Sequence, residues 1–244
     1  MKKIVFFGSK KIGLECLQIL FLAQEKLKFD IVGVLTNERG KDIIGFCKKN
    51  SLSIIKNLNH LLKFDLFDIG ISVQYHEILK KKHINRAKEV MINLHMAPLP
   101  EYRGCNQFSF AIMNSANIFG TTIHKIDSGI DSGDILFEDR FPISNKIWVE
   151  DLFNLTFRKS IKLFKNSIEK IICGNYVGIP QENLLKKRSS EIHYRKEINE
   201  LKIIDLEWDK EKIKRHIRAT YMPGFELPYT LIDDQKIYFN RKGL

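Results

Sequence analysis

The order of apolar runs and turns near the start of the chain constrains its fold most. The apolar run Lys3–Phe7 is followed by a glycine, then by a helical pattern over Ile12–Gln24, and then by a second apolar run at Ile31–Thr36. Two short apolar runs separated by a helix predict parallel strands, because a parallel pair needs a long crossover connection. We therefore predict an α/β fold, a Rossmann-like and mostly parallel sheet flanked by helices.

The alternation continues along the chain. We expect further strands and helices in the following segments: strands at Leu66–Val73, Glu89–Leu94, Gly120–Ile126 and Asp134–Pro142, and helices at Lys41–Asn50, Asn106–Met113 and Trp148–Ile172. Gly174 follows the last helix and can adopt the left-handed conformation that ends helices.

The composition shifts toward charged residues after Pro180. We place a boundary there, with a catalytic domain over residues 1–180 and a small C-terminal region over residues 181–244. In that region the pattern predicts an amphipathic helix over Trp208–Tyr221. It also predicts a terminal hairpin made of Tyr229–Ile232 and Lys236–Asn240.

The 244 residues carry a formal net charge of +11, which suits nucleic acid, an acidic membrane surface or a phosphate-bearing substrate. Lysines are scattered through the helical segments and no RNA-binding motif is present, so we expect neither a nucleic acid nor a membrane partner. No apolar run has the length of a membrane span, and Met1–Phe7 is too short for a signal peptide, which predicts a cytoplasmic protein. The four cysteines form no C-x-x-C pair, so we expect no metal site.

An asparagine and a histidine end one apolar run, and an aspartate lies in a turn downstream. Asn93 and His95 follow Val90–Ile92, and alternation along a strand aims both side chains to the same side. The carboxyl end of such a strand is where open α/β sheets bind ligands. With Asp131, these groups provide an oxyanion donor, a proton acceptor near neutral pH and a carboxylate that positions the imidazole or a relay water, a set that can move an acyl group. The alternative is a pair that only anchors a loop.

Four motifs, in the usual order, resemble the signature of the folate-dependent formyltransferase family: Asn93–His95, Leu99–Gly104, Thr121–His124 and Ile130–Ile135. Two longer stretches, Ser72–Leu79 and Arg103–Ile112, are similar to the branch that formylates amino groups of nucleotide-linked dideoxy sugars. The resemblance implies the formyltransferase fold, N10-formyltetrahydrofolate as the formyl donor, and Asn93, His95 and Asp131 as the catalytic residues.

The resemblance also implies binding residues. The folate pocket is expected to involve Gln74, Tyr75, His76, Ile78, Leu79, Asp127 and Asp131. We expect the substrate to contact Ser9, Lys10, Tyr102, Arg103, Asn106 and Tyr221. The turn that contains Ser9 and Lys10 precedes a helix, so it is either a phosphate seat or a plain strand-to-helix turn. His76 also fits a simple loop residue, and Tyr221 also fits a packing role on its helix.

The predicted function is transfer of a formyl group to a dTDP-linked aminodideoxy sugar for surface polysaccharide (O-antigen) synthesis. The sugar that the resemblance favours is dTDP-4-amino-4,6-dideoxyglucose, with 3-amino sugars as the alternative. Two other enzymes share the signature, methionyl-tRNA formyltransferase and glycinamide ribonucleotide formyltransferase, and a binding module with an inactive site is a non-enzymatic alternative. We expect a homodimer, because a hairpin alone is unstable and the C-terminal aromatic residues need cover from the core or a second subunit: Trp208, Tyr221, Phe225, Tyr229 and Phe239.

Overall fold

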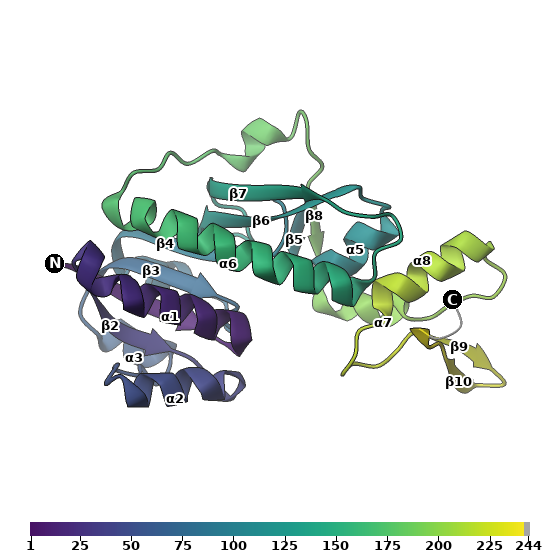
Figure 1. The fold of residues 1–244 in the computed structure, drawn as a ribbon, viewed down its shortest axis with the longest axis horizontal. Coiled ribbons are helices and arrows are strands. Elements are labelled where there is room, and N and C mark those ends of the chain that lie inside the picture. The colour runs from purple at the N-terminus through teal and green to yellow at the C-terminus, as the bar shows by residue number, and fades with distance from the viewer. Residues whose placement is uncertain (242–244) are drawn as a thin grey trace.

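The computed structural model describes residues 1–241 and has a six-stranded sheet at its centre, in the order β2-β1-β3-β4-β6-β7 (Figure 1). The strands of this sheet are β1 (Lys2–Gly8), β2 (Phe29–Leu35), β3 (Phe67–Val73), β4 (Ala87–His95), β6 (Ile118–Lys125) and β7 (Ile135–Pro142). The first four are parallel to one another, and β6 and β7 are antiparallel to their neighbours. The prediction of a mostly parallel sheet is therefore confirmed.

Helices cover both faces of this sheet. Three of them, α1 (Lys10–Leu27), α2 (Lys41–Lys49) and α6 (Val149–Cys173), pack with one face of the strands into a core that includes Ile4 and Phe6. The shorter α3 (Leu58–Lys63) and α4 (Lys81–Ile84) lie on the opposite side, where α3 packs with Val5 and Phe7. Successive residues of a strand point to opposite faces, so an uninterrupted apolar run such as Ile4–Phe7 supplies both cores.

The segment after α6 returns across the molecule. Gly174 ends α6 with φ of 73°, the left-handed conformation expected there. The chain then forms four short elements: the 3-10 helix η2 (Gln181–Leu184), the strand β8 (Glu191–His193), the 3-10 helix η3 (Arg195–Glu197) and α7 (Ile198–Leu201). Strand β8 pairs in parallel with β5 (Tyr102–Gly104). Gly104 has φ of 84°, and a Cβ atom there would collide with the carbonyl oxygen of His193, so only glycine allows this pairing.

The C-terminal elements lie at one end of the molecule, opposite α2 and α3 (Figure 1). Helix α8 (Lys210–Thr220) begins at Asp209, whose carboxylate accepts from two backbone N–H groups, and packs against α5 (Gln107–Met113). Strands β9 (Tyr229–Ile232) and β10 (Gln235–Tyr238) form the predicted hairpin. A further 3-10 helix, η1 (Glu38–Gly40), lies between β2 and α2 in the sequence.

The C-terminal aromatic residues differ in their cover. Tyr229 is buried, whereas Trp208, Tyr221 and Phe239 are partly buried. Phe225 is 69% exposed, so the expected burial of this side chain against the core of its own chain is not observed. No helix within residues 1–241 is both long and apolar enough to cross a lipid bilayer.

The core makes a direct prediction about stability. Phe164 on α6 is completely buried in the larger core, so Phe164→Ala should lower the free energy of unfolding by about 3–5 kcal/mol, through lost apolar contacts and a cavity. The same change at exposed Phe225 should alter it by less than about 0.5 kcal/mol. Urea denaturation of both variants provides the comparison, and equal losses would contradict the assigned core.

Candidate active site

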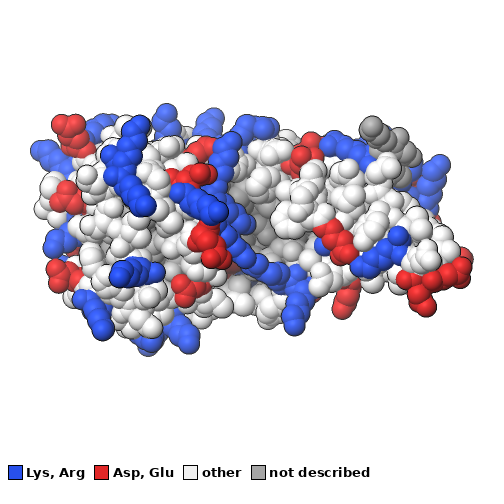
Figure 2. All heavy atoms as spheres, turned by 90° about the horizontal axis from the view of Figure 1, so that it is seen from below, with Lys and Arg blue, Asp and Glu red and all other residues white. Residues whose placement is uncertain are grey.

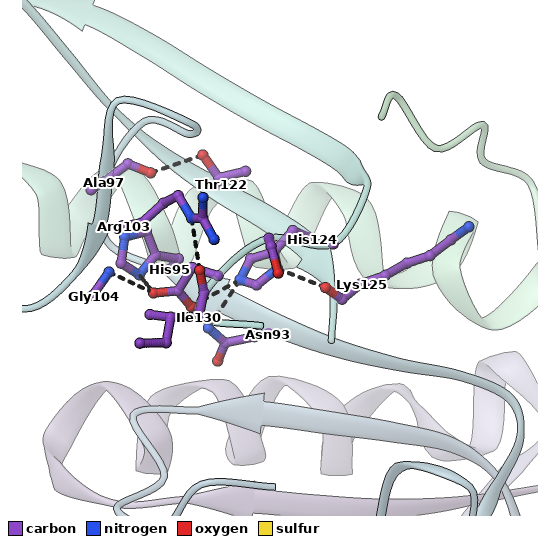
Figure 3. Close-up of polar contacts among 12 residues, drawn as sticks. Asn93, His95, Ala97, Arg103, Gly104, Thr122, His124, Lys125 and Ile130 are labelled. Atoms are coloured by element: carbon purple, nitrogen blue, oxygen red, sulfur yellow. Dashed lines mark hydrogen bonds and ion pairs between the residues drawn. The ribbon is translucent and has the colours of Figure 1, made fainter. Parts of the chain in front are cut away.

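The structure brings Asn93, His95 and Asp131 together at the carboxyl end of β4. The Nδ1 atom of His95 lies 3.6 Å from Oδ2 of Asp131, and both side chains are largely buried. Asn93 and His95 are two residues apart on β4, and both line the same cavity, which follows from strand alternation. Asp131 lies on the loop between β6 and β7. Figure 3 shows Asn93 and His95 close to each other beside the loop that contains Ile130.

A second histidine, His124, completes this cluster. It faces Asn93 across the antiparallel pair of β4 and β6, and its Nε2 lies 3.2 Å from Nδ2 of Asn93 and 3.4 Å from Oδ1 of Asp131. Its Nδ1 lies 2.7 Å from the carbonyl oxygen of Lys125, which can only accept, so Nδ1 carries a proton. In neutral His124 the Nε2 atom is then an acceptor, and it turns the NH2 group of Asn93 toward itself. The second N–H of that amide is left for a ligand.

The proton on His95 is assigned by the same reasoning. Its Nε2 lies 2.7 Å from the carbonyl oxygen of Tyr102, so Nε2–H donates to that oxygen and Nδ1 faces Asp131. A proton that reaches Nδ1 is therefore held against the carboxylate. The His95–Asp131 pair can therefore accept a proton from a ligand, and the carboxylate stabilises the imidazolium that forms.

Asp131 is kept ionised by its surroundings. Burial alone would raise the pKa of this carboxyl, but His95 and His124 in their protonated forms, together with the N–H of Gly104, outweigh that effect and hold its pKa well below the ordinary value. The Gly104 N–H donates to Oδ2 at 2.9 Å. Asp131 itself has φ of 46°, an uncommon backbone conformation for a residue with a side chain. Gly133, two residues on, lies so close to the carbonyl oxygen of Lys125 that a Cβ atom would collide with it.

A cavity of about 770 Å³ opens beside this cluster. Its lining includes Asn93, His95 and Asp131, and Asp131 is the only acidic residue that residues 1–241 contribute to it. Its remaining walls carry cations and apolar groups: Lys10, Arg195, Lys196, Lys202, Phe108, Val149, Phe153, Met222 and Phe225. Figure 2 shows a hollow near the middle of one face of the molecule, with lysine and arginine side chains along one side. The lining thus favours a ligand that is anionic at one end.

The residues expected around a folate take different positions. Gln74 and Tyr75 line the cavity, and Gln74 has φ of 54°. The side chain of Leu79 is in the smaller core, and Ile78 is 83% exposed. His76 lies 3.4 Å from Glu77 in the same loop. Asp127 accepts hydrogen bonds from Ser132 and from the N–H of Gly129, and so shapes the loop that carries Asp131.

The residues expected to contact substrate also separate into groups. Lys10 and Asn106 line the cavity, and Ser9 is buried with its hydroxyl donating to the carbonyl oxygen of Gln74. Arg103 donates from Nε to the carbonyl oxygen of Ile130 at 2.7 Å and faces a second cavity of about 370 Å³ behind the Asp131 loop.

Two tyrosines from the same expectation have their rings elsewhere. The ring of Tyr102 packs in the core against Phe119, with 5.6 Å between ring centroids. The ring of Tyr221 meets Trp148 edge-on, with centroids 5.7 Å apart, which is the packing role that the sequence left open. Neither side chain is part of the cavity lining described above.

Several lining residues had no signal in the sequence. Arg195, Lys196 and Lys202 come from the segment between α6 and α8, and Met222 and Phe225 follow α8. Their positions depend on tertiary folding, not on any local pattern. His124 did lie in one of the four motifs, but nothing in the motif indicated its contact with Asn93.

Comparisons with known proteins agree with this geometry. A family model described as Formyl transferase matches residues 48–166. The chain is 30% identical over 172 residues to GDP-perosamine N-formyltransferase from Brucella melitensis, which is 70% of this chain and 63% of that relative, so it spans less than two thirds of the relative's length. It is also 30% identical over 227 residues to methionyl-tRNA formyltransferase from Borreliella burgdorferi, covering 82% of this chain and 70% of that protein.

Solved structures give the same result. An N-formyltransferase from Helicobacter canadensis, in complex with folinic acid and dTDP-3-aminofucose, has a TM-score of 0.79 and 25% identity, covering 97% of this chain and 86% of that one. WlaRD, a sugar 3N-formyl transferase solved in the presence of dTDP and 5-N-formyl-THF, has a TM-score of 0.78 and 27% identity, covering 97% and 85%. The resemblance predicted from four ordered motifs is confirmed, and the chain belongs to the formyl transferase family, in which the nucleotide-sugar N-formyltransferase branch fits it.

Proposed function

We propose that this protein transfers a formyl group from N10-formyltetrahydrofolate to the amino group of a nucleotide-linked aminodideoxy sugar. The observation that carries this proposal is the uneven lining of the larger cavity. One end holds an ionised carboxylate between two imidazoles, and the walls hold four cations. A molecule with an amine at one end and phosphates at the other matches both parts.

The cavity also suits the formyl donor. Its volume of about 770 Å³ lies within the usual range for cofactor and small-molecule sites, about 300–1,000 Å³. Gln74 and Tyr75 line it at the end of β3, and the Tyr75 ring is fixed edge-on against Phe7 with centroids 5.6 Å apart. When bound, the folate supplies an activated formyl group. The relatives in complex with folinic acid and 5-N-formyl-THF support this choice of donor.

The chemistry that these residues can perform begins with the amine. An ammonium group has no lone pair, so it must lose a proton before it can attack a carbonyl carbon. Asp131, held in its charged form, attracts that ammonium, and Nδ1 of His95 is the nitrogen placed to take the proton. The N–H of Asn93 that does not face His124 is the donor available to a developing oxyanion, an interaction typically worth about 3 kcal/mol of barrier. The bond between the formyl carbon and N10 of the donor would then break, and the proton held by His95 would be available to N10 as tetrahydrofolate leaves.

The cations converge from three parts of the sequence. Lys10 begins α1, Arg39 lies in η1 and Arg195 begins η3. Burial lowers the pKa of Lys10, and the charges of Arg39 and Arg195 lower it further, so each arginine repels the ammonium group of Lys10. A bound diphosphate would relieve this repulsion. We therefore assign the phosphates of the substrate to this end of the cavity.

The choice of sugar rests on the sequence resemblance over Arg103–Ile112. We propose dTDP-4-amino-4,6-dideoxyglucose, made for surface polysaccharide such as O-antigen, as the substrate. Two similar structures, one solved with dTDP-3-aminofucose and one of a sugar 3N-formyl transferase, make a 3-amino sugar the nearest alternative. Both proposed reactants are polyanions that do not cross a bilayer unaided, so we place the reaction in the cytoplasm.

A transfer RNA substrate is the main alternative, because the Borreliella burgdorferi relative is a methionyl-tRNA formyltransferase. A methionyl-tRNA formyltransferase from Clostridium thermocellum also covers 99% of this chain and 92% of its own, but with a TM-score of 0.64. The two sugar N-formyltransferases reach 0.79 and 0.78, and this higher structural agreement favours a sugar substrate. We keep residues 1–180 as the proposed catalytic domain, and the residues after 180 close one side of its cavity.

We also propose that two copies associate through the C-terminal hairpin. Four large apolar side chains on β9 and β10 are about half exposed: Leu231, Ile232, Ile237 and Tyr238. An isolated two-stranded hairpin is marginally stable in water, so cover from a second copy would stabilise it.

The catalytic assignment predicts large losses of activity. His95→Ala and Asp131→Ala should each lower kcat by at least about a hundredfold, because general acid-base groups usually contribute that much. His60→Ala, an exposed histidine on α3, is the control and should keep wild-type activity. The assay is the gain of one formyl group in the mass of a dTDP-aminosugar. Near-normal turnover by His95→Ala would remove the proposed mechanism.

The cation assignment predicts how nucleotides and RNA compete. The dTDP nucleotide should inhibit competitively with the aminosugar, and more weakly as salt rises, because partly exposed ion pairs are screened within about 10 Å at roughly 0.1 M. Arg195→Ala should weaken dTDP at least about tenfold, the size of a lost charge-assisted hydrogen bond, whereas Arg158→Ala on the exposed face of α6 should not. Strong inhibition by uncharged transfer RNA, with none by dTDP, would favour the tRNA enzyme.

The proposed dimer predicts the molecular mass that the protein should have in solution. Light scattering at micromolar concentration should give twice the chain mass of 28.5 kDa. Ile232 and Ile237 share a face of the hairpin, since Ile237 pairs with Thr230, so Ile232→Glu with Ile237→Glu should give the monomer mass. Lys187→Glu is an exposed control that should remain dimeric. A monomeric wild type would refute the dimer and leave the chemistry untouched.

A further inference from the structure

The side chain of Gln181 connects the returning C-terminal segment to the loop that carries Asp131. Gln181 begins η2 directly after Pro180 and is only 7% exposed. Its Nε2 atom donates to the carbonyl oxygen of Asp131 and to that of Gly133, each at 2.8 Å. Both N–H bonds of the amide are therefore directed into this loop.

The orientation of this amide is unambiguous. If the amide were turned over, its oxygen would face two carbonyl oxygens, which cannot donate. In the observed orientation Oε1 is buried and finds no hydrogen-bond partner among residues 1–241. A buried amide that leaves its own oxygen unsatisfied is costly, so the two donated bonds are the reason for a glutamine here.

The loop needs such a contact because its backbone is unusual. Asp131 has φ of 46°, and the next turn is pressed against Lys125 at Gly133. Conformations of this kind persist only where the surroundings hold them. The carboxylate is fixed by the Gly104 N–H and lies against His95 and His124, while the backbone of the same residue is fixed by Gln181 from the opposite side.

Another residue of the same segment makes a useful contrast. Arg188 donates to the carbonyl oxygen of Leu99 and forms a two-pronged contact with Glu138. These bonds also attach the returning segment to the core. They do not reach the loop between Gly129 and Gly133.

We propose that Gln181 is a positioning residue that sets the direction of the Asp131 carboxylate between His95 and His124. It acts through the backbone of residues 131 and 133 and does not touch the reacting atoms. The kinetic part of this proposal rests on the proposed function. The positioning itself is a property of the protein alone.

The test replaces the donors and keeps the shape. Gln181→Met preserves the length of the side chain without any N–H, and Gln181→Glu places an oxygen against the two carbonyls. Glu182→Gln changes an exposed neighbour in η2 and controls for any substitution in this helix. Arg188→Met removes another attachment of the returning segment to the core and controls for a general loss of that attachment. The reference is Asp131→Asn, which removes the carboxylate charge directly.

The first readout needs no substrate. The imidazole ¹⁵N signals of His95 and His124, measured by NMR at several pH values, should move in Gln181→Met in the same direction as in Asp131→Asn. The titratable groups facing Asp131 in this measurement are the two histidines, which are charged only when protonated, and Arg103 binds the backbone of the same loop. Glu182→Gln and Arg188→Met should leave these signals unchanged.

The second readout is kinetic. In Gln181→Met kcat should fall at least tenfold while KM for the aminosugar stays within twofold, because Asp131 keeps the charge that attracts the ammonium and the phosphates bind outside this loop. Histidine signals that match the wild type in both Gln181 variants would overturn the proposal, and so would a fall in kcat that Arg188→Met reproduces. If the wild type formylates no aminosugar, the proposed function fails, and the NMR comparison still decides the role of Gln181.

Discussion

The active site of this protein is organised around one largely buried carboxylate that lies between two imidazoles. Taking a charge out of water is costly unless hydrogen bonds and opposite charges compensate it, and here compensation comes from three different strands. His95 ends β4, His124 lies opposite on β6, and Gly104 donates from β5. Gly104 must lack a side chain, because β8 lies directly against it. The short pairing of β5 with β8 is thus part of what keeps Asp131 charged.

The same arrangement explains why the site is asymmetric. Each histidine donates one N–H to a backbone carbonyl, so each presents its other nitrogen to the centre of the cluster. His124 uses that nitrogen to orient the amide of Asn93, whereas His95 turns it toward Asp131. Two identical side chains therefore act differently, and the difference comes from which ring nitrogen the backbone has already occupied.

Much of the fold could be predicted from the sequence, because strands and long helices leave a periodic pattern within a few neighbouring residues. The six strands of the sheet, α1, α6 and the terminal hairpin all follow such patterns. The pairing of β5 with β8 could not be predicted, since each strand is three residues long and the partner lies far along the chain. Motif order located Asn93, His95 and Asp131, but it carried no information on where each side chain points. It therefore did not show that the rings of Tyr102 and Tyr221 pack against other aromatic rings. It also did not show that His124 contacts Asn93.

The larger cavity takes its walls from almost the whole length of the chain, from Lys10 at the start of α1 to Phe225 after α8. During synthesis the sheet can assemble early, since β1 to β4 are complete by His95. The cavity cannot close until the ribosome has released the residues beyond α8. A nascent chain that has just completed the sheet therefore still lacks three of the four cations of the cavity, Arg195, Lys196 and Lys202, and gains them only when the C-terminal segment folds back.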